Sequence, residues 1–129
     1  MITIPSMPTR FRRLPQLEID LEVHELRTLA FVLDRIVSPE GYTAGLCYGV
    51  ERKLHQHSLG HTHTRHVAYQ FSKAVGEGMN PPGKNSYHQY IGGYLSKRWN
   101  ESITVKELAA IRDAWARHIA RSIYEQIGD

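Results

Sequence analysis

The chain has 129 residues, of which 41% are hydrophobic and 22% are charged, and its formal net charge is +3. This length suits one domain, and the balance of apolar and charged residues excludes disorder of the whole chain. No run of about 18 apolar residues occurs, so we expect no membrane partner. The first five residues lack the basic and apolar regions of an export signal, and the single cysteine, Cys47, has no partner for an internal disulfide. We therefore expect a cytoplasmic protein.

Charge is distributed unevenly along the sequence. Residues 1–13 contain three arginines and no acid, whereas residues 14–40 contain more acidic than basic groups. Residues 41–100 carry seven basic groups against only Glu51 and Glu77. This pattern predicts a basic surface suited to phosphates and an acidic segment suited to a protein partner.

The first half of the chain changes its hydrophobic period near residue 23. Apolar and polar residues alternate over 17–23, which predicts a half-buried strand. Apolar residues then recur at helical spacing and predict a helix to about residue 37. Ser38-Pro39-Glu40 predicts the end of that helix and the start of a second one, which ends before residue 58.

Three further helices are predicted after residue 60. The third begins at Thr62 or Thr64 and ends at Gly76 and Gly78. Residues 80–85 predict a loop, and a fourth helix begins near residue 86. The last helix begins at the capping box of residues 104–107 and runs almost to the glycine at residue 128.

These elements predict a mainly α protein, a single-domain bundle of about five helices with a short N-terminal β element or extended arm. We divide the chain into a basic N-terminal arm, residues 1–16, and a helical domain, residues 17–129. The aromatic and alanine-rich face of the last helix suits either the core or the seam of a homodimer, and both interpretations stay open.

Histidines are concentrated just before and within the predicted third helix. Residues 55–66 hold five of the eight histidines, and no Asp or Glu occurs from Arg52 to Gly76. Backbone N–H groups at the start of that helix, with Arg65 beside them, predict a site for phosphate. The surface that we predict for nucleic acid or another anion comprises Arg10, Arg12, Arg13, Arg52, Lys53, His61, His63, Arg65, His66, Lys73, Lys84, Lys97 and Arg98.

A zinc site is the alternative use of the same segment, because imidazole is a common metal ligand. The candidate ligands are His61, His63 and His66. Catalytic zinc also needs a carboxylate close by, and only distant residues offer one. Those residues are Glu51, Glu77 and Asp113. The stretch 61–66 is similar to the His-x-His-x-Asp-His box of the metallo-β-lactamase family, but Arg65 stands at the Asp position, which excludes that family.

Three classes of function follow from the sequence. The leading one is a small non-enzymatic nucleic-acid-binding or regulatory protein that uses the basic, histidine-rich surface and needs no cofactor. The second is an interaction protein of the kind encoded by phages and mobile elements, which inhibits or adapts a larger nucleic-acid-handling complex. The third is a metal-dependent enzyme built on the histidine cluster. Steep salt dependence would favour the first class, and bound zinc the third.

Overall fold

The computed structural model describes residues 1–36, 45–57, 61–79, 91–96 and 103–128, except for the side chains of His61, Thr62 and Ser96. In this part of the chain the helices are α1 (Val23–Leu33), α2 (Leu46–Gln56), α3 (His61–Met79), α4 (Ile91–Ser96) and α5 (Val105–Ile127). The strands are β1 (Ile2–Ile4), β2 (Met7–Pro8), β3 (Arg13–Leu14) and β4 (Leu17–Ile19). The predicted helical bundle with a short N-terminal β element is therefore confirmed.

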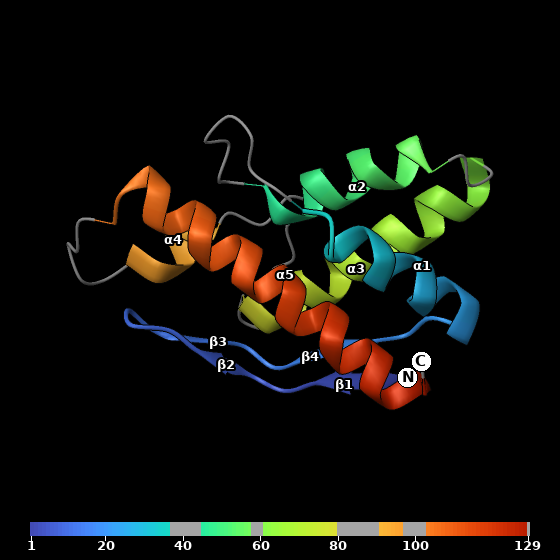
Figure 1. Cartoon of the computed structure of the whole chain (residues 1–129), viewed down its shortest axis with the longest axis horizontal. Coiled ribbons are helices and arrows are strands. Elements are labelled where there is room, and N and C mark those ends of the chain that lie inside the picture. Colours follow the sequence, from blue (N-terminus) through green and yellow to red (C-terminus); the bar gives the residue numbers. More distant parts are fainter. Residues whose placement is uncertain (37–44, 58–60, 80–90, 97–102, 129) are drawn as a thin grey trace.

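The N-terminal strands lie along one side of the helices (Figure 1). β1 pairs with β4 in antiparallel register, with Ile4 opposite Leu17, and β2 pairs with β3. Both Ile4 and Leu14 are fully buried, and the Gln126 side-chain amide donates a 2.6 Å hydrogen bond to the Thr3 carbonyl. Residues 1–16 thus lie against the bundle, while the division of the chain at residue 16 stays a prediction.

The predicted alternation holds over residues 17–22 and fails at Val23, which begins α1 and is 52% exposed. Leu17, Ile19 and Leu21 are buried, whereas Glu18 and Asp20 are exposed. The paired strand ends at Ile19, and α1 begins at Val23, where the period changes in the sequence.

α1 and α3 share one helical neighbour, α2. α1 packs against α5 and α2, whereas α3 packs against α2 and β4. The predicted start of the second helix, the loop at 80–85 and the start of the fourth helix lie outside the described residues. None of the helices in the described ranges has the length and apolar character needed to cross a bilayer.

Both predicted ends of the last helix are confirmed in α5. The Thr104 hydroxyl accepts the Glu107 N–H, and the Glu107 carboxylate accepts the Thr104 N–H, each at 3.1 Å. This backbone hydrogen bond lowers the pKa of Glu107. Gly128 closes the helix in the left-handed conformation, with φ of 81°. The apolar face formed by Trp115, Ile119 and Ile123 is fully buried within the chain, so the core uses it.

The predicted end of the third helix is wrong, because α3 continues through Gly76 and Gly78 to Met79. A Cβ atom at Gly78 would lie 2.9 Å from Leu17 Cδ2 and 3.2 Å from the Gln16 carbonyl oxygen. Gly78 therefore does not end the helix. Its missing side chain permits close packing of α3 on β4 and on the residues just before β4.

We expect Gly78→Ala to lower the free energy of unfolding by about 1–2 kcal/mol, because overpacking costs more than the gain in helix propensity. Gly49→Ala in α2 is the matched control, since among the residues that the structure describes its Cβ would meet only Ile36 Cδ1, at an ordinary 3.6 Å. Urea denaturation of both variants tests the contact. A Gly78→Ala protein as stable as the Gly49→Ala protein would contradict the close approach.

Candidate functional site

A buried carboxylate lies in the first turn of α1. The Glu25 side chain is only 7% exposed. Its Oε1 atom accepts the backbone N–H of Glu22 at 3.0 Å, as expected for a residue that caps the start of a helix. Its Oε2 atom lies 3.7 Å from His63 Nε2 and 3.6 Å from His66 Nε2. Partners on both oxygens offset the cost of burying this polar group.

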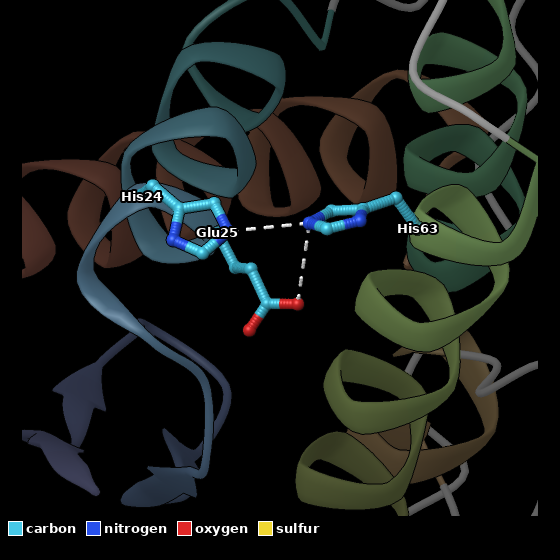
Figure 2. Close-up of side chains that lie close together, drawn as sticks. All are labelled: His24, Glu25 and His63. Carbon is cyan, nitrogen blue, oxygen red and sulfur yellow. Dashed lines mark hydrogen bonds and ion pairs between the residues drawn. The ribbon is translucent and has the colours of Figure 1, made fainter.

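His24 brings a third imidazole to the same place. Its Nε2 atom lies 3.2 Å from His63 Nε2, and the two ring centroids are 5.4 Å apart. Figure 2 shows His24 and Glu25 from α1 converging with His63 from α3. The other ring nitrogen of His24, Nδ1, lies 3.6 Å from Glu22 Oε2.

The spacing of the two α3 histidines explains why both face Glu25. Residues three apart lie on the same side of a helix, so His63 and His66 project in the same direction from α3. We call His24, Glu25, His63 and His66 the histidine–carboxylate cluster. An open pocket of about 500 Å³ adjoins it. Its lining comprises Met1, Asp20, Leu21, Glu22, His24, Glu25, His63, His66 and Gln70.

Three members of the cluster present ligand atoms to one point. One atom each from His24, Glu25 and His63 lies within 4.8 Å of the other two. Two imidazole nitrogens and one carboxylate oxygen form a donor set that binds transition-metal ions in many proteins. His66 contacts the carboxylate but is not part of this group of three.

The predicted zinc ligands are only partly brought together. His63 belongs to the group of three, His66 lies beside it, and the side chain of His61 lies outside the described part of the chain. The carboxylate in this group is Glu25. The sequence suggests three other residues for this role, Glu51, Glu77 and Asp113. Asp113 instead forms a 2.7 Å ion pair with Arg112. The anion-binding role of His63 and His66 stays a prediction. The charged group beside both imidazoles is itself an anion, the Glu25 carboxylate.

The three arginines of the predicted arm make contacts within the chain. Arg10 forms an ion pair with Glu107 at 3.3 Å. Arg12 donates a 2.7 Å hydrogen bond to the Tyr94 carbonyl and stacks on the Tyr94 ring. Arg13 donates to the Ser6 hydroxyl at 2.9 Å. These contacts tie the segment to α4, α5 and its own strands.

The remaining predicted basic residues lie on α2 and α3 or outside the described ranges. Arg52 is exposed and stacks over the Tyr48 ring, and Lys53 is half-buried. Arg65 and Lys73 are exposed on α3. The other three predicted residues, Lys84, Lys97 and Arg98, lie in segments that the structure does not describe.

Sequence reasoning missed His24 and Glu25 as site residues. The pair lies 38 residues or more from His63, on a different helix, so the pattern within either helix cannot show that they meet. The sequence did carry one local signal. Glu25 stands three residues after Glu22, and this spacing at the start of a helix is typical of a capping box. That signal places Glu25 in the first turn of α1 but does not indicate its burial.

Comparison with known proteins adds no family assignment. No family model, curated protein or solved structure matches the chain.

Proposed function

We propose that this is a small nucleic-acid-binding or regulatory protein that binds through the exposed side of α3. The observation that carries the proposal is a row of three exposed residues four positions apart, Arg65, Tyr69 and Lys73. We call this row the α3 stripe. Tyr69 is 53% exposed although it is a large aromatic residue, and no acidic residue occurs on α3 before Glu77.

The composition of the α3 stripe suits single-stranded nucleic acid. Arginine and lysine contact phosphates, and an exposed tyrosine ring offers a face on which a base can stack. A second basic–aromatic pair lies on the neighbouring helix α2, where the Arg52 guanidinium is 5.7 Å from the centre of the Tyr48 ring. The N-terminal arginines have partners within the chain, so we assign the binding surface to α2 and α3. We propose a cytoplasmic location separately, because the N-terminal sequence has no basic and apolar export signal.

A protein partner is the second candidate, because an acidic surface accompanies the basic one. Glu18, Asp20 and Glu22 are all exposed where β4 leads into α1. Such a surface suits a basic region of a nucleic-acid-handling complex that the protein would inhibit or adapt, as phage proteins do. This candidate predicts no direct binding of nucleic acid by the isolated chain.

Fluorescence anisotropy with labelled single-stranded DNA, RNA and duplex DNA at 50 and 200 mM salt tests the proposal. We expect binding that weakens steeply with salt, because phosphate contacts release counterions. Removing both charges in an Arg65→Ala/Lys73→Ala variant should weaken binding about tenfold or more and reduce the salt slope by about 1 per lost contact.

The matched control is Arg117→Ala/Arg121→Ala. This variant also removes two exposed arginines, which lie four residues apart on α5. We expect this variant to bind as the unaltered protein does. Equal losses in the two double variants would contradict an assignment to the α3 stripe. No binding at either salt concentration would contradict the nucleic-acid proposal and favour the protein partner.

A further inference from the structure

We infer that His24, Glu25 and His63 form a binding site for one divalent transition-metal ion, and that Zn²⁺ is the ion that occupies it. The inference is independent of the proposed nucleic-acid binding, because the α3 stripe and the histidine–carboxylate cluster share no residue. It rests on the distances between the ligand atoms, on the contacts that orient them and on their chemical type.

Two of the three distances match those around a bound metal. Zinc–nitrogen and zinc–oxygen bonds are about 2.0–2.2 Å long, so two ligands of a tetrahedral ion lie about 3.3–3.6 Å apart. The His24 and His63 Nε2 atoms are 3.2 Å apart, and His63 Nε2 is 3.7 Å from Glu25 Oε2. The ligand atoms of His24 and Glu25 lie within 4.8 Å of each other, so these two side chains would approach by up to about 1.2–1.5 Å to share one ion.

Neighbouring groups hold two of the three ligands in a suitable orientation. The Glu22 N–H holds Oε1 of Glu25, which leaves Oε2 directed toward the α3 histidines. The Glu22 carboxylate lies 3.6 Å from His24 Nδ1, and Nε2 is the ring nitrogen that faces His63. Carboxylates play this orienting role beside many metal-bound histidines.

His66 supports the carboxylate instead of acting as a ligand. It approaches Glu25 Oε2 at 3.6 Å from the next turn of α3, and it lies outside the group of three that surrounds a common point. We therefore class His66 as a positioning residue. Its replacement should weaken metal binding less than the replacement of His24 or His63.

The ligand types select among metals. Two imidazoles and one carboxylate suit zinc and neighbouring transition metals, whereas magnesium and calcium prefer sets made of oxygen atoms. Three protein ligands also leave the fourth tetrahedral position open, and the pocket of about 500 Å³ adjoins the cluster. An open position of this kind admits water or a small ligand to the metal.

Isothermal titration calorimetry of the chelator-treated full chain with ZnCl₂ tests the inference. We expect one zinc per chain, an affinity at least about 100-fold lower in His24→Ala and His63→Ala, and about 10-fold lower in His66→Ala. Glu25→Gln keeps an oxygen that can accept the Glu22 N–H, so it tests the carboxylate ligand without removing the helix cap. The control is His55→Ala, which removes an exposed histidine of the same histidine-rich region and should bind zinc as the unaltered chain does.

His24→Ala is the decisive variant, because His24 lies outside the histidine-rich segment. Zinc held by His61, His63 and His66 alone would bind equally well to the His24→Ala protein, and that result would overturn the inference. Absence of zinc binding, or equal losses in His24→Ala and His55→Ala, would overturn it too. Circular dichroism of each variant confirms that a loss of binding does not arise from unfolding.

Discussion

Replacing Phe71 by alanine is expected to lower the free energy of unfolding by about 3–5 kcal/mol, the usual cost of removing a fully buried phenylalanine. Phe71 is fully buried in α3, the helix that packs against both α2 and β4. Domains of this kind are stable by only about 5–15 kcal/mol, so this one truncation removes a large share of the total.

Tyr69→Ala is the matched control for Phe71→Ala, since both replace an aromatic residue on α3. Tyr69 is 53% exposed, and its loss should change stability by less than about 0.5 kcal/mol. Urea denaturation followed by circular dichroism measures both values. Similar losses in the two variants would contradict the orientation of α3, and with it the placement of Arg65, Tyr69 and Lys73 on the exposed side.

Zinc is expected to stabilise the folded chain by about 4 kcal/mol when its free concentration is a thousand times the dissociation constant. The gain arises because the ligands on α1 and α3 come together only in the folded state. Zinc bound to histidines of the unfolded chain would reduce this gain. Urea denaturation at fixed pH, with and without zinc, provides the measurement.

His24→Ala separates this effect from general metal binding. The His24 side chain is 61% exposed, so the metal-free variant should unfold close to the unaltered chain. Added zinc should not stabilise it, whereas His55→Ala should gain as much as the unaltered chain. A zinc-dependent gain that survives His24→Ala would place the metal elsewhere.

The sequence predicts best what depends on neighbouring residues. The capping box at Thr104 and Glu107 and the left-handed Gly128 both occur where the local pattern indicates, because cap geometry involves only one helical turn. The alternation over 17–22 also indicates which side chains are buried, since successive residues of an extended chain point to opposite faces. Val23 departs from the pattern because a helix begins there, and its side chain is exposed.

Tertiary packing decided the features that the sequence could not show. Gly78 looks like the end of a helix in the sequence, but it lies within α3, at a point where β4 and the residues before it pass too close for a side chain. Arg12 looks like a free cation, but Tyr94 of α4 provides both its hydrogen-bond acceptor and an aromatic ring. Each outcome depends on a residue more than 60 positions away.

The candidate site shows the same division between local and distant information. The histidine-rich segment identified His63 and His66, for an anion or as the alternative for zinc, but it gave them different neighbours. Glu25 lies 38 positions before His63, and Figure 2 shows that the two side chains meet between α1 and α3. Compositional clustering located the region of the site, whereas the ligand set needed the fold.

X-ray diffraction from crystals of the zinc-loaded protein, recorded on both sides of the zinc absorption edge, locates the metal and its ligands. We expect one anomalous peak per chain, about 2.0–2.2 Å from His24 Nε2, His63 Nε2 and a Glu25 oxygen. A peak surrounded by histidines of residues 55–66 without His24 and Glu25, or no peak between α1 and α3, would contradict the proposed metal site.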